Sequence, residues 1–259
     1  MRALSLPGCA CRGAFQIAVM SRLVAAGERF DLVAGASSGS LTGATYVSGL
    51  ASVGPDMWRS MAGTPVVSRR YLRSEKSVFG MSVVLREALE RFLPEDKLHG
   101  TSTELLVATT HARRFLTGKQ NALVVHSNRT RRDMHDVLVA SCFIPIIYAR
   151  LPVLDGEVHI DGGAADNTLM DELVGRGATD ITVITPFPEG RIARTIFAKE
   201  APPIAPPGVR LRLIFPERAL RQKHFDFAPE PLEEALSMPH REVVFEPKTT
   251  IDTRVQIAR

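Results

Sequence analysis

Residues 30–48 read FDLVAGASSGSLTGATYVS, and this stretch decides the fold. A short apolar run, Phe30 to Ala34, is followed by the pentapeptide GASSG at 35–39 and then by small residues of helical character. A sharp turn between a buried strand and a helix lifts a serine hydroxyl out of the backbone, and flanking glycines permit that turn. The stretch therefore predicts a strand, a nucleophile elbow with Ser37 at its apex, and a helix.

Ser37 has two interpretations on motif grounds alone. It is either a nucleophile that attacks a carbonyl carbon or a polar cap at the N-terminus of the following helix. The two are compatible, because the same helix terminus offers backbone N–H groups and a positive dipole end to an oxyanion. The neighbours expected to shape the elbow are Gly35, Ser38 and Gly39. A nucleophilic serine also requires a base, which must come from elsewhere in the chain.

Strand-like and helix-like segments alternate around the elbow. Before it come an apolar run over 3–6 and a helix over 14–26 that is apolar on most faces, as buried helices are. This alternation predicts an α/β fold with a parallel sheet and helices on its faces. Residues 113–118 are expected to join two strands, and Asp155-Gly156 predicts a type I′ hairpin turn. Further helices are expected over 55–61, 77–92, 131–141 and 229–237, and further strands over 104–109, 122–126, 148–154, 157–160, 180–185 and 209–215.

Length and composition limit the classes of protein. A chain of 259 residues favours one domain with a large core. We expect a single domain over 1–259, with core motifs over 3–187 and a C-terminal strand-helix extension over 188–259. Apolar residues make up 45% and charged residues 23%, as in soluble globular proteins. A formal net charge of +4 without aromatic RNA-binding signatures argues against nucleic-acid binding.

Cysteine usage and hydropathy bear on the compartment. Three cysteines exclude a complete disulfide framework, and their spacing lacks a second ligand pair, so no metal is expected. A reducing, cytoplasmic compartment fits this usage best. The segment before Cys9 is too short for the apolar region of a signal peptide. Residues 32–55 carry no charge but are rich in Gly, Ser and Thr, so no transmembrane segment is predicted.

Two further motifs carry polar chemistry. The loop after the first strand contains Gly8, Cys9, Ala10, Cys11, Arg12 and Gly13. It fails as a dinucleotide fingerprint because the middle glycine is replaced by Ala10, which leaves an oxyanion-binding loop or a plain tight turn as interpretations. Asp161 follows an apolar strand and precedes Gly162 and Gly163. Its carboxylate either points along the sheet edge toward a nucleophile or serves an ordinary β-turn.

In order and spacing these motifs resemble the patatin-like phospholipase family. That family combines a glycine-rich loop with a basic residue, a Gly-x-Ser-x-Gly elbow, and an Asp-Gly-Gly or Asp-Gly-Ala motif. Further similarity lies in residues 140–145, 161–167, 177–180 and 225–230, so the resemblance covers most of the chain. It implies a three-layer α/β/α fold with a mainly parallel central sheet.

The resemblance also implies a mechanism. Ser37 and Asp161 would form a dyad without a histidine, with Ser37 as nucleophile and Asp161 as base for acylation and deacylation. The loop from Gly8 to Gly13 would stabilise the oxyanion, with Arg12 as its basic residue. The substrate would be a phospholipid, a lysophospholipid or another lipid acyl ester, and no cofactor is implied. Cys9 and Ala10 replace family glycines, which would strain the loop if either position needs a positive φ.

Three alternatives remain open. An α/β-hydrolase would use a serine, an aspartate and a histidine in that order, and both His224 and His240 follow Asp161. A catalytically weak patatin-like domain would bind lipid or a protein partner instead of turning over substrate. The basic group Arg69, Arg70, Arg73 and Lys76 is either a peripheral contact for an anionic membrane or a solvated face. The sequence does not indicate an oligomeric state.

Overall fold

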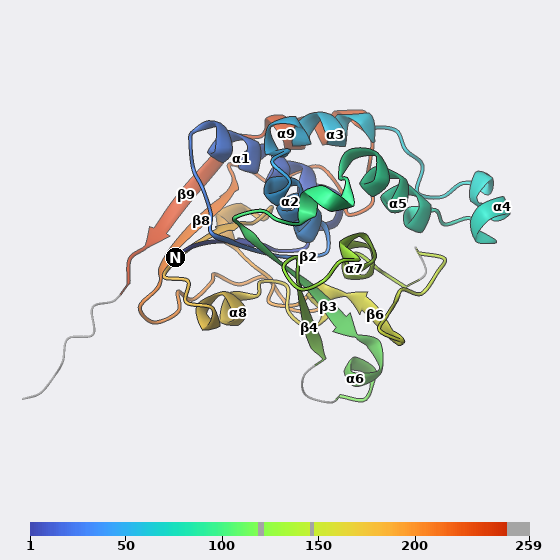
Figure 1. The fold of residues 1–259 in the computed structure, drawn as a ribbon. Helices are drawn as coiled ribbons and strands as arrows, with labels where there is room; N and C mark the ends of the chain where they lie inside the picture. Colours follow the sequence, from blue (N-terminus) through green and yellow to red (C-terminus); the bar gives the residue numbers. More distant parts are fainter. Residues whose placement is uncertain (119–121, 146–147, 248–259) are drawn as a thin grey trace, which may run out of the picture.

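A central sheet organises the molecule, which is described by a computed structural model over residues 1–118, 122–145 and 148–247 (Figure 1). Its strands are β1 (Arg2–Leu6), β2 (Leu32–Ala36), β3 (Glu104–His111), β4 (Leu123–Ser127), β5 (Val153–Leu154), β6 (Glu157–Asp161), β7 (Asp180–Ile184), β8 (Arg210–Pro216) and β9 (His240–Phe245). They lie in the order β5-β6-β3-β2-β1-β7-β8-β9, and β4 also pairs with β3.

The centre of the sheet is parallel and its edges are antiparallel. Strands β3, β2, β1, β7 and β8 pair in parallel, whereas β4, β6, β5 and β9 add antiparallel pairs at the two sides. The chain leaves β1 toward β2 on one side and returns to β7 on the other. Ligands bind at such a switch in strand order, beyond the carboxyl ends of the strands. The loop at 8–13 and the elbow at 35–39 both follow carboxyl ends in this region.

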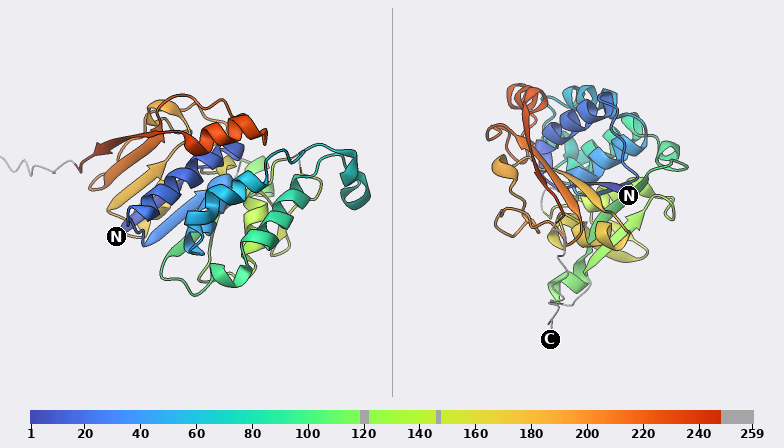
Figure 2. Two further views of the ribbon diagram at one scale, coloured as in Figure 1. Left: turned by 90° about the horizontal axis from the view of Figure 1, so that it is seen from above. Right: turned by 90° about the vertical axis from the view of Figure 1, so that its left-hand side faces the viewer.

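Helices cover both faces of the sheet, which confirms the predicted three-layer α/β/α fold (Figure 2). One layer is thick, with α1, α2, α5 and α7 packed on the strands and α9 packed on α1. The other is thin and is built mainly from α8 and loops. The helices are α1 (Gly13–Ala25), α2 (Ser38–Val47), α3 (Gly54–Ser60), α4 (Leu72–Glu75), α5 (Met81–Phe92), α6 (Ala112–Leu116), α7 (Met134–Ser141), α8 (Met170–Gly175) and α9 (Pro229–Ser237).

The C-terminal extension belongs to the same sheet. Strands β8 and β9 extend its parallel centre, and α9 buries Leu232, Ala235 and Leu236 against α1. The predicted strand-helix unit therefore continues into one more strand, β9, which the sequence analysis missed. Residues 248–259 of the expected extension lie outside the described residues.

Several predicted boundaries were wrong. The helix expected from Ser77 begins at Met81, because residues 77–80 close a hairpin in which the Gly80 N–H donates to the carbonyl of Val66. The helix expected from Arg131 begins at Met134, and the strand expected over 148–154 is confined to Val153–Leu154. The connection over 113–118 contains a short helix, α6. The turn at Asp155-Gly156 has a positive φ at both residues, as type I′ requires.

Candidate active site

The elbow is a strained turn at Ser37 that requires glycine at positions 35 and 39. Ser37 has φ 52° and ψ −132° between β2 and α2, a conformation that costs free energy for a residue with a side chain. A Cβ atom on Gly39 would lie 1.9 Å from the carbonyl oxygen of Leu6. A Cβ atom on Gly35 would lie 2.6 Å from the backbone nitrogen of Ser40. Gly39 is therefore required for the turn to pack against the end of β1, and Gly35 is required for β2 to pack against the start of α2.

Strand register explains how Ser37 and Asp161 meet. Parallel β2 follows one edge of β3 until Ala36 pairs with Ala108. Antiparallel β6 pairs with the next residues of β3, with Asp161 opposite Thr109. Because β4 occupies the other edge of β3 over 106–110, β2 and β6 approach each other end to end along the same edge. The residue after β2 and the last residue of β6 are thereby brought together.

Asp161 is buried and hydrogen-bonded. Its side chain is 3% exposed, and Oδ1 accepts a 2.8 Å hydrogen bond from the Gly163 N–H. Burial raises the pKa of the Asp161 carboxyl to about 6, and hydrogen bonds from the Ser37 hydroxyl and from Gly163 offset part of that rise. A Cβ atom on Gly162 would lie 2.1 Å from the carbonyl oxygen of Ala108, so this motif also requires a glycine.

The loop at 8–13 presents one free N–H group. Gly8 N donates to Asn167 Oδ1 (2.7 Å), Cys9 N to Ser38 Oγ (3.0 Å) and Cys11 N to the carbonyl of His224 (2.9 Å). Across 1–118, 122–145 and 148–247, the N–H groups of Ala10 and Ser38 have no acceptor. Both residues line the pocket that contains Ser37, so the pair can stabilise an oxyanion formed there.

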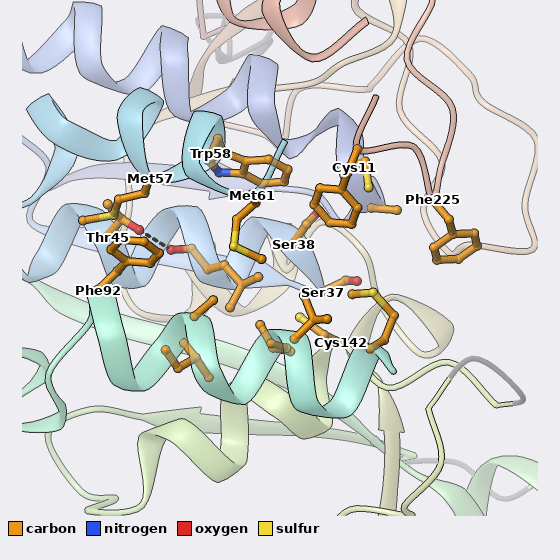
Figure 3. A pocket seen from close by; sticks show the side chains of 18 of the residues that line it. Cys11, Ser37, Ser38, Thr45, Met57, Trp58, Met61, Phe92, Cys142 and Phe225 are labelled. Atoms are coloured by element: carbon orange, nitrogen blue, oxygen red, sulfur yellow. Dashed lines mark hydrogen bonds between the residues drawn. The ribbon is translucent and has the colours of Figure 1, made fainter. Parts of the chain in front are cut away.

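An apolar pocket of about 150 Å³ extends from the elbow between α2, α3 and α5 (Figure 3). Ser37 and Cys142 lie at one end, and Thr45 and Phe92 lie at the other. Trp58 and the methionine side chains of Met57 and Met61 line its α3 side. Phe227 stacks on Trp58 with ring centroids 6.4 Å apart, so the C-terminal segment helps to close the pocket. In the described part of the chain, no group of three or more His, Cys, Asp or Glu side chains is arranged to hold a metal ion.

Comparison with known proteins accounts for this combination of elbow, aspartate and loop. Residues 4–174 match the family described as Patatin-like phospholipase, which acts on lipid substrates. The chain belongs to this family. The match contains the elbow, the loop and the aspartate motif, and the family assignment made from these motifs is confirmed.

Relatives of the patatin-like domain are larger proteins. The bovine (Bos taurus) Patatin-like phospholipase domain-containing protein 2 is 28% identical over 178 residues, which cover 66% of this chain and 35% of the bovine one. The mouse (Mus musculus) 1-acylglycerol-3-phosphate O-acyltransferase Pnpla3 is 28% identical over 134 residues, 51% of this chain and 31% of its own. The chain thus spans about a third of these relatives' length. The solved structure of VipD from Legionella pneumophila aligns over 95% of this chain and 67% of its own, with 12% identity and a TM-score of 0.43.

The two histidines considered for a triad do not lie between Ser37 and Asp161. His224 lines the pocket, and its backbone carbonyl accepts the Cys11 N–H. His240 begins β9 at the far side of the sheet, where Nε2 lies 3.4 Å from Glu242. Neither ring hydrogen-bonds to Ser37 or Asp161 within the described ranges. In this patatin-like domain the Ser37 hydroxyl is the side-chain group that lowers the pKa of the Asp161 carboxyl.

Arg12 and Asn167 hold the loop in place. The Arg12 guanidinium donates to the carbonyl of Gln222 (3.1 Å) and lies over the ring of Phe187, so it anchors the loop to the C-terminal region. Asn167 is the last residue of segment 161–167, which resembles the family, and the sequence alone assigns it no role. Its amide accepts from Gly8 N and donates to the carbonyls of Gly8 and Ala193 (3.3 Å each). Its position after a glycine-rich aspartate turn is the signal that could have revealed it.

The altered loop is strained at Ala10 and not at Cys9. Ala10 has φ 53°, whereas Cys9 has φ −152°, which any residue adopts. We expect Ala10→Gly to raise the free energy of unfolding by about 0.5–1 kcal/mol, because glycine removes the left-handed penalty. Cys9→Gly is the matched control and should lower the free energy of unfolding, since Cys9 is buried and its backbone is unstrained. Urea unfolding measures both, and changes of the same sign would contradict this assignment.

Proposed function

We propose that this chain is a serine acyl-ester hydrolase that cleaves phospholipids or related lipid esters through Ser37 and Asp161. The observation that carries the proposal is the strand register that brings Ser37, at one end of an apolar pocket, to the buried Asp161 carboxyl, whose pKa the Ser37 hydroxyl lowers. A carboxylate with a pKa near 6 is deprotonated at neutral pH and basic enough to accept a proton during attack.

Acylation begins when Asp161 accepts the Ser37 proton while Oγ attacks the ester carbonyl carbon. The negative charge moves to the carbonyl oxygen, where the free N–H groups of Ala10 and Ser38 stabilise it. Collapse of this intermediate breaks the bond to the alcohol oxygen. That oxygen takes the proton from Asp161 and leaves, and the acyl group remains on Ser37.

Deacylation repeats these steps with water. Asp161 removes a proton from the water molecule as its oxygen attacks the acyl carbonyl. The second intermediate expels Ser37, which regains its proton from Asp161, and the fatty acid is released. One carboxylate therefore serves as base and then as acid in each half of the reaction.

The pocket supports a lipid as substrate. Its lining from α3 and α5 is almost entirely aliphatic, aromatic and thioether side chains, which match a hydrocarbon chain. Each methylene group transferred from water to such a lining contributes about 0.8 kcal/mol to binding. The pocket reaches Ser37 directly, so an acyl chain inside it places the ester carbonyl at the nucleophile.

A fluorophosphonate probe tests the nucleophile. We expect the wild-type protein to be labelled at Ser37, and Ser37→Ala to lose both labelling and release of fatty acid from lipids. Ser48→Ala is the matched control and should keep both, because Ser48 lies at the end of α2 and its hydroxyl has no partner in the described structure. Folded wild-type protein that resists the probe and releases no fatty acid would instead favour a lipid-binding or partner-binding domain.

A further inference from the structure

A hydrogen-bonded arm projects from the molecule between the two helices that line the pocket. The arm comprises residues 66–80, leads from α3 into α5, and carries α4 at its tip, which stands apart from the rest of the molecule (Figures 1 and 2). Ser68 N donates to the carbonyl of Val78 (2.8 Å), and Gly80 N donates to the carbonyl of Val66 (2.9 Å). Tyr71 is buried in the base, where its ring packs against Gly80. The arm is therefore a hairpin that is stabilised by backbone hydrogen bonds and by the packing of Tyr71.

The tip of the arm concentrates positive charge. Arg69, Arg70, Arg73 and Lys76 are exposed, and none of them pairs with a carboxylate in the described residues. Four cations and one carboxylate give the arm a formal charge of +3, most of the +4 that the whole chain carries. The carboxylate, Glu75, is itself neutralised by Arg150 from a neighbouring loop at 3.2 Å. A solvated surface usually mixes both signs, whereas the exposed charges of this tip are all positive.

Exposed aliphatic side chains accompany the charge. Val67 is 58% exposed and Leu72 is 49% exposed on the arm. Arg150 also donates to the carbonyl of Ser74 (2.9 Å), which fixes the adjoining loop and the 63% exposed side chain of Leu151 beside the arm. Basic and aliphatic groups on one surface are typical of segments that bind at the interface of an anionic bilayer.

The arm lies at the end of the pocket that contains Ser37. It enters α5 at Met81, the first residue of that helix, and Met81 lines the pocket. Figure 3 shows Ser37 near the start of α5 and Phe92 at the other end of the helix. A surface that contacts the arm would therefore face the reactive end of the pocket and not its closed end.

We propose that the arm docks the protein on anionic lipid surfaces and presents the Ser37 end of the pocket to the bilayer. This proposal rests on the lipid hydrolysis proposed above, since it names the physical state in which that substrate is met. The four basic residues attract the charged headgroups, and Leu72 and Val67 enter the boundary between headgroups and acyl chains.

Vesicle co-sedimentation of the full chain with Ser37→Ala tests the docking without hydrolysis. We expect binding to vesicles of phosphatidylcholine with phosphatidylserine, weak binding to phosphatidylcholine alone, and loss of binding as salt increases. Replacing Arg69, Arg70, Arg73 and Lys76 with Ser should lower partitioning by about 600-fold, since each contributes about fivefold. A triple variant that keeps Arg70, which contacts the Tyr71 ring, should lose most of this binding while protecting the base of the arm.

The matched control removes the same charge from positions outside the arm. Replacing Arg29, Arg91, Lys97 and Arg132 with Ser also lowers the formal net charge from +4 to zero. This variant should retain binding within about threefold, because charges beyond a Debye length are screened. Equal losses in the two variants, or no preference of the parent for anionic vesicles, would overturn the proposal.

Hydrolysis of a soluble short-chain ester separates this proposal from the proposed function. When the arm substitutions are made in a chain that keeps Ser37, the variants should retain hydrolysis of the soluble ester and lose hydrolysis of vesicle lipid. If vesicle binding depends on the arm but fluorophosphonate does not label the protein, the proposed hydrolase function is wrong and the proposed docking surface still holds. Hydrolysis of vesicle lipid that does not change in the arm variants would overturn the docking and leave the hydrolase intact.

Discussion

Asp161→Asn is expected to hydrolyse esters about a thousandfold more slowly than wild type, because a general base contributes about 10²- to 10⁴-fold. Asparagine keeps the size of the side chain and the oxygen that accepts the Gly163 N–H, so the turn at 161–163 should persist. What it cannot do is accept the Ser37 proton. Initial rates on a short-chain ester measure the loss, and an unchanged circular dichroism spectrum shows that the variant folds.

The two histidine variants are the controls for this loss. His240→Ala lies at the far side of the sheet and should retain wild-type rates. His224→Ala removes a pocket-lining ring but keeps the backbone carbonyl that accepts the Cys11 N–H, so its rate should fall by no more than a few-fold. A folded histidine variant as slow as Asp161→Asn would show that a histidine is the base and would favour the triad.

The sequence predicted those parts of the site that local chemistry determines. The elbow needs glycine at 35 and 39 because Cβ atoms there would collide with the backbone, and this requirement leaves a readable motif. Asp161 follows a buried strand and precedes Gly162, whose Cβ atom would collide with Ala108. Order and spacing then suggested the pairing of Ser37 with Asp161. The physical reason for it, two strands meeting end to end along β3, became visible only in the sheet register.

The remaining features depend on contacts distant in sequence. Nothing near Ala10 distinguishes its positive φ from the negative φ of Cys9, since both replace a glycine in the same loop. Asn167 acts 159 residues away from Gly8. The start of α5 at Met81 reflects pairing across the arm and not a change in helical periodicity. Local patterns carry no information about such long-range pairing.

Burial of Asp161 links activity to stability. The same desolvation that raises the pKa of this carboxyl to about 6 makes it a stronger base than an exposed aspartate. It also disfavours the folded state whenever the carboxyl is charged. The site is therefore expected to reduce the stability of the fold at the pH at which it works.

The pH dependence of rate and stability tests this link. Below pH 6 the wild-type kcat/KM should fall about tenfold per pH unit, because the protonated carboxyl cannot act as a base. The folded pKa lies about two units above the ordinary value of 3.8, and each unit corresponds to about 1.4 kcal/mol. Below pH 4 the Asp161 carboxyl is protonated in both the folded and the unfolded protein, so it does not change the free energy of unfolding. As the pH rises from 4 to 6, the carboxyl ionises in the unfolded protein first, and the free energy of unfolding falls.

Asp161→Asn should therefore be more stable than wild type by up to about 3 kcal/mol at pH 7, and this difference should disappear near pH 4. Urea unfolding followed by the fluorescence of Trp58, the single tryptophan, measures it across the pH range. Asp96→Asn removes an exposed carboxylate and should show no such gain. A variant no more stable than wild type at pH 7, or a wild-type rate that stays flat down to pH 4, would mean that Asp161 is not held as a buried base.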